Sequence, residues 1–525
     1  MRCELLRSFD QVYVLDLHGN TRRKEVCPDG SPDRNVFDIK QGVAILFLVR
    51  LPRSGASESM TTQAEVRHSE LWGLRGDDGR NPGKYQWLSA HDVSSTTWVT
   101  LDPLGPDFLF VPQDTALAVE YQSAFPVPVV MGLNGDPAPG IVTTHDDFAI
   151  SWSPDEASNK VDRLLSTQSE DDARSIFRLC SQAQWSYTRA KTELADRHWE
   201  HEIRPILYRP FDLRYTVFNR NVAVHRRGRV MRHLTAGANV ALITSRLTKG
   251  EQFHHAQATR DLVEVICMSP NTSNNGFVFP LYLYPEPGRD AIVRDDQINE
   301  RVDAVGRAGG DYSSLPSLMH RLFPEPEYPR WPNLDPFLLA DLRDRLALRF
   351  IPDGQGDLTE TFGPEDVFDY IYAILHSATY RSRYAEFLKR DFPRIPFTSN
   401  RNLFTNLVLK GRDLIALHLM ESPLLDALIT TFPEPGSDKV ERVAYNDNQR
   451  RVYINKTQYF DGVPKAVWEF HVGGYQVCDK WLKDRKGRKL DNDNLMHYQR
   501  IVVALNETIR LMAEIDALIT CWPVA

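Results

Sequence analysis

The pattern of apolar and polar residues predicts a short helix and two buried strands at the start of the chain. Residues 1–9 (MRCELLRSF) have the pattern of a helix end, and apolar runs of strand length follow at residues 11–17 (QVYVLDL) and 43–49 (VAILFLV). Short apolar runs bounded by turn-forming residues are typical of buried strands. A doubly wound α/β domain contains several βα units, so these residues predict only the end of such a sheet.

Residues 200–290 have a different pattern, which predicts a strand-rich region. Short apolar or alternating runs are separated by polar clusters; they are RYTVF (214–218), NVALITSR (239–246), VEVICM (263–268) and FVFPLYLYP (277–285). Pro210, within YRPFDLR, excludes the interior of a helix. Residues 290–335 are rich in Asp, Gly and Pro, which predicts a linker.

Apolar residues at three- and four-residue spacing predict helices on either side of that region. They occur between residues 156 and 198, between 365 and 390, and from about residue 493 onward, and a further apolar helix (DLIALHLM, 413–420) is expected after Gly411. The apolar stripe of the last helix is more typical of core packing than of a dimer seam.

Length and composition place few limits on function but favour a cytoplasmic protein. The 525 residues suffice for about three domains, no run of about 18 apolar residues occurs, and the first residues lack the pattern of a secretion signal. The six cysteines are scattered, with no CxxC pair and no histidine at finger spacing. We therefore expect reduced thiols, with neither a disulfide framework nor a zinc site.

Charge is distributed unevenly along the chain. The net charge is −8, yet residues 201–260 contain eleven Lys and Arg against three Asp and Glu. Arginine predominates there and alternates with aromatic residues, a combination that binds phosphates and can reach base edges. Double-stranded DNA is the partner that this stretch predicts. The alternative is a solvated surface whose arginines pair with acids elsewhere in the chain.

The candidate DNA contacts are basic and polar residues of this region and of a second basic stretch, residues 476–490. Arginine can read guanine and asparagine can read adenine, while either stretch could neutralise phosphates. The candidates are Arg209, Arg214, Arg226, Arg227, Arg229, Arg232, Arg246, Lys249, His254, His255, Arg260, Asn274, Asn275, Lys483, Arg485 and Lys486.

Several of these candidates also have a structural interpretation. Arg209 and Asp212 could form an internal ion pair that fixes their loop. Gly228 is expected to bend the backbone so that Arg226, Arg227 and Arg229 project toward solvent. His254 and His255 fit a polar contact better than a metal site, because adjacent strand residues face opposite ways. The stretch at 476–490 could be an ordinary basic turn.

Longer segments carry a resemblance to a known family. FDQVYVLDLHGN (9–20) and NVFDIKQGVAILFLVR (35–50), followed in order by SELWGLR, GIVTTHDDF, YRPFDLRY, FVFPLYLYP and VGGYQVCDKWLKDRKGRKL, resemble the C-terminal part of Type ISP restriction-modification enzymes. These are single chains that join a nuclease and a helicase-like motor to an adenine-specific DNA methyltransferase and a target-recognition domain. The resemblance implies DNA recognition in restriction-modification or phage defence.

The resemblance also implies a fold class and domain limits. Residues 1–60 would be the terminal strands of a methyltransferase Rossmann-like sheet, an incomplete α/β remnant, and residues 61–199 a connecting layer with a helical bridge. Residues 200–290 would be the basic, β-rich part of a mixed α+β target-recognition domain, and residues 291–525 its linker and helical C-terminal part. By its position, Phe37 would stack on the flipped-out target adenine; the alternative is a core aromatic.

The motifs that carry methyl transfer in that family do not occur in the sequence. There is neither an Asn/Asp-Pro-Pro-Tyr/Phe motif nor a helix-opening glycine turn, and the nearest candidate, GLNGDPAPG (132–140), has prolines that exclude the helix. We expect the chain alone to bind no S-adenosylmethionine and to be inactive without a separate or upstream catalytic portion. A metal-dependent nuclease is disfavoured because Asp261–Glu264 lacks the lysine of that motif. A non-catalytic protein-interaction fragment of a defence system is the alternative.

Overall fold

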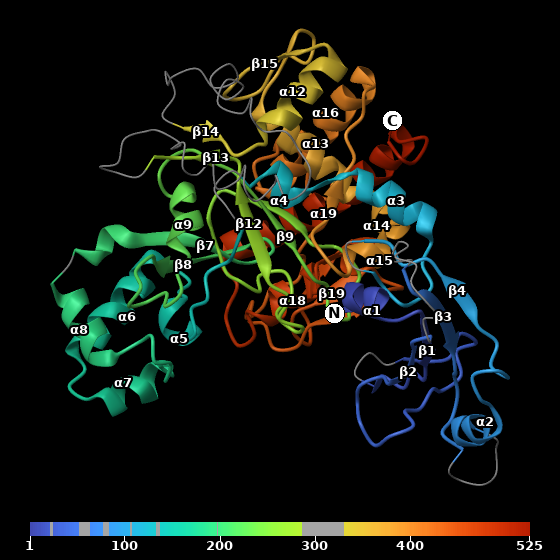
Figure 1. Ribbon diagram of the computed structural model, residues 1–525. Coiled ribbons are helices and arrows are strands. Elements are labelled where there is room, and N and C mark those ends of the chain that lie inside the picture. Colours follow the sequence, from blue (N-terminus) through green and yellow to red (C-terminus); the bar gives the residue numbers. More distant parts are fainter. Residues whose placement is uncertain are drawn as a thin grey trace. The chain divides into compact units, whose positions relative to one another are not determined.

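The computed structural model describes residues 1–21, 25–51, 63–76, 83–105, 108–132, 137–196, 198–285 and 330–524 (Figure 1). These residues form two compact units, Met1–Glu120 and Tyr121–Ala525. The fold is mixed α/β, with several small sheets and a long C-terminal helix. Most of the linker predicted at 290–335 lies outside the described residues.

The first unit contains a four-stranded sheet in the order β2-β1-β3-β4. Strand β1 (Gln11–Asp16) pairs antiparallel with β2 (Ala44–Val49) and parallel with β3 (Glu65–Glu70), while β4 (Val99–Leu101) pairs with β3. The predicted helix before β1 is α1 (Arg2–Ser8), and α2 (Lys84–Ala90) follows β3. The prediction that the first 50 residues form two neighbouring strands at one end of a sheet is confirmed.

The burial predicted for the second of these strands is wrong for the described chain. β1 is buried, but in β2 Leu46, Phe47 and Leu48 are 44%, 40% and 36% exposed. The cause is position, because among the strands of the described residues β2 is at the edge of the sheet and pairs with β1 alone. The apolar run therefore predicted the strand correctly but not its burial, which depends on the neighbouring elements.

In the second unit, two small sheets contain most of the strand-rich region. One has the order β10-β9-β12-β6 and the other β11-β7-β8. Of the predicted strand VEVICM only its first residue is in a strand, and residues 265–268 form turns. The strands are β6 (Ala138–Pro139), β7 (Ile203–Arg209), β8 (Asp212–Val217), β9 (Ala241–Ser245), β10 (Ala256–Thr259), β11 (Leu262–Val263) and β12 (Gly276–Pro280).

The helices predicted between residues 156 and 198 are present, and each begins at a serine. Ser153, Ser169 and Ser186 accept hydrogen bonds from backbone N–H groups in the first turns of α6 (Pro154–Ser166), α7 (Glu170–Phe177) and α8 (Tyr187–Ala195). Such caps satisfy donors that a helix leaves unpaired. The apolar faces of these helices pack together around Phe148 and Trp185.

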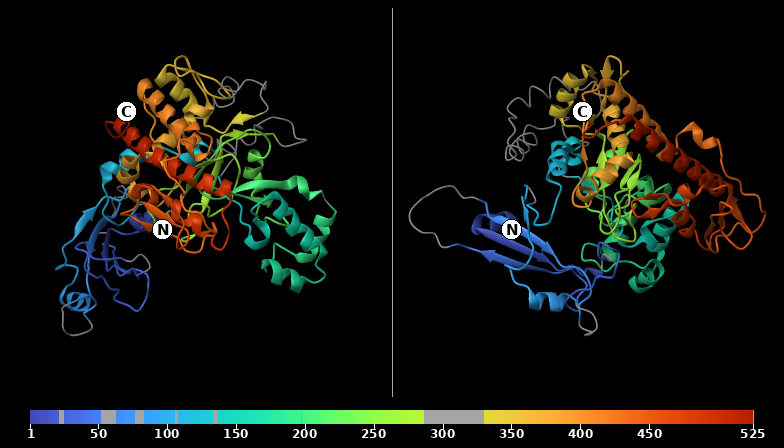
Figure 2. Two further views of the ribbon diagram at one scale, coloured as in Figure 1. Left: turned by 180° about the vertical axis from the view of Figure 1, so that it is seen from behind. Right: turned by 90° about the vertical axis from the view of Figure 1, so that its right-hand side faces the viewer.

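The C-terminal part is built on three packed helices, α13 (Pro364–His376), α16 (Arg401–His418) and α19 (Asn492–Leu518), which lie side by side in both figures (Figure 2). Gly411 does not precede a new helix, as the sequence suggested, but lies inside α16. A Cβ atom there would collide with the carbonyl of Asp369 on α13, so glycine permits the close approach of the two helices.

Shorter elements connect these parts. Those before residue 290 are α3 (Thr115–Ser123), β5 (Phe125–Pro126), α4 (Val127–Val130), α5 (Asp146–Ala149), η2 (Trp199–Glu202), α9 (Gly228–Met231), η3 (Arg232–Leu234) and β13 (Tyr282–Leu283). Those after it are β14 (Trp331–Pro332), α12 (Pro336–Leu346), β15 (Arg349–Phe350), β16 (Thr361–Phe362), α14 (Ala378–Arg383), α15 (Ala385–Leu388), β17 (Arg394–Ile395), η4 (Pro423–Asp426), β18 (Ala444–Asn446), β19 (Arg451–Tyr453), β20 (Tyr459–Asp461), α17 (Lys465–Trp468), β21 (His471–Val472), β22 (Tyr475–Gln476) and α18 (Val477–Lys483). Within the described ranges, no helix is long and apolar enough to cross a membrane.

Candidate nucleic-acid interface

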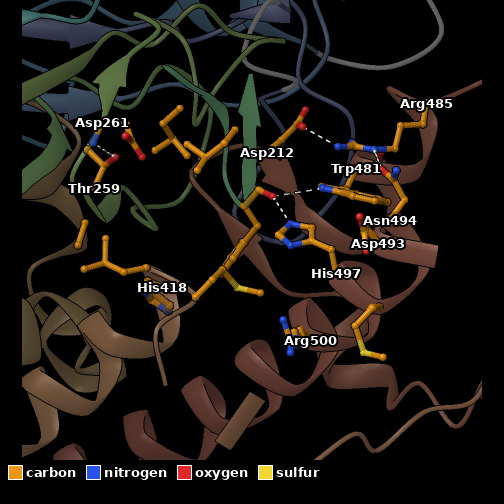
Figure 3. Close-up of a pocket in the computed structure, with 17 residues that line it drawn as sticks. Asp212, Thr259, Asp261, His418, Trp481, Arg485, Asp493, Asn494, His497 and Arg500 are labelled. Atoms are coloured by element: carbon orange, nitrogen blue, oxygen red, sulfur yellow. Dashed lines mark hydrogen bonds and ion pairs between the residues drawn. The ribbon is translucent and has the colours of Figure 1, made fainter. Parts of the chain in front are cut away.

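The YRPFDLR segment forms the tip of the β7–β8 hairpin, with Pro210 and Phe211 in the turn. Phe211 has φ +61°, a conformation that is unfavourable for a residue with a large side chain. Its carbonyl accepts hydrogen bonds from Trp481 Nε1 at 3.2 Å and His497 Nε2 at 2.8 Å (Figure 3). A strained turn persists only where its surroundings hold it, and here C-terminal residues do so.

Asp212 joins the same hairpin to the C-terminal basic stretch. Its carboxylate is fully buried and lies 2.9 Å from Arg214 and 2.7 Å from Arg485. Arg209, which was expected to pair with Asp212, pairs instead with Glu264 at 2.7 Å. Burial raises the pKa of Glu264, and Arg209 opposes that shift. Three of the candidate DNA contacts, Arg209, Arg214 and Arg485, therefore form ion pairs inside the protein. An internal ion pair was the structural alternative for the YRPFDLR segment, but not for Arg485.

A cavity of about 490 Å³ lies beside this turn (Figure 3). Its lining is mixed: Leu213, Met420 and Met496 are among the apolar residues, and Asp261 and Arg500 are among the charged ones. The lining comes from β7, β8, β10, α16, α18 and α19. No sequence motif indicated the cavity, because its residues are dispersed over almost 300 positions of the chain.

The exposed arginines lie at the start of α9, in the preceding loop and in the first helical turn. Arg226, Arg227 and Arg229 are all exposed, and within the described ranges neither Arg226 nor Arg227 has a carboxylate partner. The predicted bend is present but falls on Arg227, with φ +50°, whereas Gly228 begins α9. The guanidinium of Arg226 also lies 5.7 Å from the ring centre of Phe218.

Two further basic residues, Arg232 and His233, follow this loop. His233 is buried, and burial together with the nearby charges of Arg232 and Arg229 lowers its pKa to about 3. Arg232 is half-buried and donates to the carbonyl of Tyr284 at 2.8 Å. His233 therefore carries no charge of its own near neutral pH.

The polar loop at 269–276 is organised around Glu251. That carboxylate accepts hydrogen bonds from Ser269 at 2.7 Å, Thr272 at 2.6 Å and Asn274 at 3.0 Å, and from His255 Nε2 at 3.1 Å. Burial would raise the pKa of Glu251, but the hydrogen bonds outweigh it and lower the pKa to about 2. Two candidate contacts, His255 and Asn274, are therefore buried and bonded to Glu251 within the protein.

Most remaining candidates are partnered. Arg246 pairs with Asp391 at 3.0 Å, Arg260 with Glu421 at 2.7 Å and Lys483 with Asp479 at 2.7 Å. His254 is half-buried, and burial and the charge of Arg381 lower its pKa to about 3, so it does not carry a charge near neutral pH. Exposed candidates with no carboxylate partner in the described part of the chain are Lys249 and Lys486, and Asn275 is exposed as well.

In the first unit, Phe37 is a surface residue, which excludes the core interpretation within this chain. Its ring is 58% exposed. The side chain of Arg75 donates to the carbonyls of Asn35 at 2.9 Å and Phe37 at 3.0 Å, and a fully buried ion pair between Asp33 and Lys84, 2.7 Å apart, holds the preceding residues. The loop thus presents an exposed aromatic ring on a fixed backbone. Its role in base stacking stays a prediction.

The glycine-rich candidate GLNGDPAPG (132–140) does not fit a methyl-donor turn. Residues 133–136 lie outside the described chain, Ala138–Pro139 form β6, and Gly140 packs against the backbone of residues 263–265. A Cβ at Gly140 would come within 2.8 Å of that backbone, so the glycine serves the chain's own packing. We therefore derive no step through S-adenosylmethionine from these residues.

Comparison with known proteins identifies the family. The sequence profile of the Type ISP C-terminal specificity domain matches residues 136–514. This chain belongs to that family. Its fold is similar to those of the DrdV–DNA complex (19% identity, TM-score 0.58), the ATP-dependent Type ISP restriction-modification enzyme LlaBIII bound to DNA (16%, 0.59) and a nuclease-deletion mutant of the Type ISP enzyme LlaGI in complex with a DNA substrate mimic (18%, 0.57).

These similarities cover 98% of the Type ISP chain described here but only part of each larger protein. The matched share is 48% of the DrdV chain, 31% of LlaBIII and 37% of LlaGI, so this chain spans between about a third and a half of their length. At such identities the likeness shows the fold alone. No curated protein matches the chain significantly.

Proposed function

We propose that this chain recognises double-stranded DNA sequence-specifically, as the specificity portion of an adenine-specific DNA methyltransferase in restriction-modification or phage defence. The observation that carries the proposal is the exposed arginine loop at 226–229, the outward-facing part of a strongly basic stretch in an acidic chain. Phosphate neutralisation by such residues supplies much of a protein's affinity for DNA. The DNA-bound state of the three similar structures supports the same partner.

The first unit has the features expected of the closing strands of a methyltransferase sheet. The exposed apolar edge strand β2 would be covered by the rest of that sheet, and the fixed, exposed ring of Phe37 would stack on the flipped adenine. The residues that bind the methyl donor would then belong to a separate or upstream portion. On this proposal residues 61–199 connect the sheet to the recognition domain, whose basic part spans 200–290 and whose helical part extends to residue 525.

Salt-dependent binding of the full chain to duplex DNA tests the proposal. We expect the logarithm of the association constant to fall linearly with the logarithm of salt concentration, with a slope of about −0.9 for each phosphate contacted. Fluorescence anisotropy with labelled duplexes between about 50 and 200 mM salt measures this. Absence of salt-dependent binding would contradict the proposal and favour the non-catalytic protein-interaction fragment.

Two neighbouring asparagines should respond differently to substitution. Asn275 is exposed, so Asn275→Ala is expected to reduce discrimination by on the order of 1–3 kcal/mol at one base pair if its amide reads an adenine. Asn274 donates to Glu251 and accepts from the backbone of Lys249, so Asn274→Ala should instead lower the free energy of unfolding by roughly 1–3 kcal/mol.

Duplexes selected from a random library, together with urea denaturation, separate these two effects. If Asn274→Ala loses discrimination between duplexes but no stability, the Asn274 amide of the parent protein must leave its buried position to read DNA. An Asn275→Ala protein that binds selected and scrambled duplexes as the parent does would exclude base reading by that residue.

A further inference from the structure

Arginine and aromatic side chains alternate in a stack that joins three distant segments of the second unit. The Arg209 guanidinium lies 3.9 Å from the ring centre of Tyr208, and the Arg214 guanidinium lies 4.1 Å from Tyr208 and 3.8 Å from Trp152. Arg488 completes the series at 4.2 Å from Trp152. A cation over an aromatic face is attracted by the ring's quadrupole, and more strongly where water is partly excluded.

The inner and outer members of this stack differ in how their charge is compensated. Arg209 pairs with Glu264 and Arg214 with Asp212, and all four side chains are largely buried. Arg488 is exposed and makes no ion pair with any residue in the described ranges. The stack therefore ends at the surface in a guanidinium whose charge the described chain does not neutralise.

Arg488 is also held in place through its backbone. Its carbonyl accepts a hydrogen bond from Val440 at 2.9 Å, its N–H donates to Arg485 at 3.0 Å, and Gly487 donates to Val440 at 2.7 Å. Stacking uses the face of the guanidinium and leaves its in-plane N–H groups available for hydrogen bonds. An arginine fixed at both ends loses less side-chain entropy when it binds a ligand.

We infer that Arg488, positioned by Trp152, donates to a phosphate of the DNA backbone. The inference rests on the proposed function and adds a contact that the basic composition of residues 476–490 did not single out. Phosphate is favoured over a base edge because the exposed Lys486 lies two residues from Arg488 and adds a positive charge without a fixed pattern of donors. An acidic protein surface is the competing ligand that the test must exclude.

The full chain is compared with its Arg488→Ala, Trp152→Phe, Trp152→Ala and Trp152→Ala/Arg488→Ala variants in the salt-dependent binding assay. Arg488→Ala is expected to weaken binding to unrelated duplexes equally and to reduce the salt slope by about one. Trp152→Ala should weaken binding roughly twofold to tenfold because Arg488 is no longer positioned. The double variant should bind about as weakly as Arg488→Ala alone, because Trp152 acts through Arg488. Trp152→Phe keeps an aromatic face and should retain most of the affinity.

Arg510→Ala is the matched control, because it removes the same charge from a guanidinium already bonded to Glu507 and Glu514. An unchanged salt slope in Arg488→Ala, with normal salt-dependent binding by the parent, would overturn the inference and leave the proposed function intact. A parent chain without salt-dependent DNA binding would overturn both. Fully additive losses in the double variant would remove the positioning role of Trp152. If Trp152→Ala does not fold, Arg488→Ala still decides whether the phosphate contact exists.

Discussion

Replacing Asp212 with alanine is expected to lower the free energy of unfolding by about 3–5 kcal/mol. The carboxylate is fully buried and lies within 2.9 Å of Arg214 and 2.7 Å of Arg485. Burial lowers the pKa of Arg485, and Asp212 opposes that shift. Without this carboxylate, the largely buried guanidiniums of Arg214 and Arg485 would lose the acid that they share. Removing one partner of a buried ion pair is costly because it leaves buried charge uncompensated.

Urea denaturation measures this effect: the urea concentration at the midpoint of unfolding should fall, while the slope of the unfolding free energy against urea concentration stays the same. Asp391→Ala is the matched control, because that acid also pairs with an arginine, Arg246, but both side chains are well exposed. An exposed pair contributes only about 0–1 kcal/mol. Equal losses in the two variants would show that Asp212 contributes no more than a surface acid.

The same substitution should also disturb the hairpin turn. Asp212 follows Phe211, whose left-handed backbone is held by Trp481 and His497, and Arg485 belongs to the same C-terminal group. Losing the carboxylate removes one of the ties between the hairpin and the C-terminal elements. Faster hydrogen exchange at residues 207–213, without a change in α13, would locate the effect at the turn.

Elements determined by local pattern were predictable from the sequence. The run at 11–17, the run NVALITSR (239–246) and the periodic last helix contain β1, β9 and α19. Prediction failed where distant residues decide the outcome. Gly411 looked like a boundary, but its role inside α16 is set by the carbonyl of Asp369 on another helix. The exposure of β2 depends on which strands lie beside it, which an apolar run does not specify.

In the candidate site, too, local composition was predictable from the sequence, whereas contacts between distant residues were not. Charge counting located the basic stretch, but it could not separate arginines that face inward from those that face outward. Arg485 reaches Asp212 across 273 positions, and Arg209 reaches Glu264 across 55. Neither pair has a spacing that a sequence pattern could reveal. Burial removes Arg209, Arg214, His255, Asn274 and Arg485 from the candidates, and Arg226, Arg227 and Arg229 are the densest group among the exposed ones.

These three arginines carry the second large effect. Changing Arg226, Arg227 and Arg229 together to alanine is expected to reduce the salt slope of DNA binding by roughly three, about one for each phosphate that is no longer neutralised. At about 0.15 M salt this corresponds to a loss of affinity on the order of 100-fold. All three side chains are exposed; Arg226 and Arg227 directly precede α9 and Arg229 lies in its first turn. Because phosphates carry no sequence information, binding to every duplex should weaken similarly.

The control for that experiment removes the same amount of charge from cations that are already paired. Arg246, Arg260 and Lys483 contact Asp391, Glu421 and Asp479, so changing those three to alanine should leave the salt slope nearly unaltered. Anisotropy titrations of both triple variants on several unrelated duplexes make the comparison. If the two variants show the same reduction in slope, net charge rather than the 226–229 loop governs binding. If neither slope is reduced, the arginines of that loop do not contact phosphate, and another surface of the chain would have to bind the DNA.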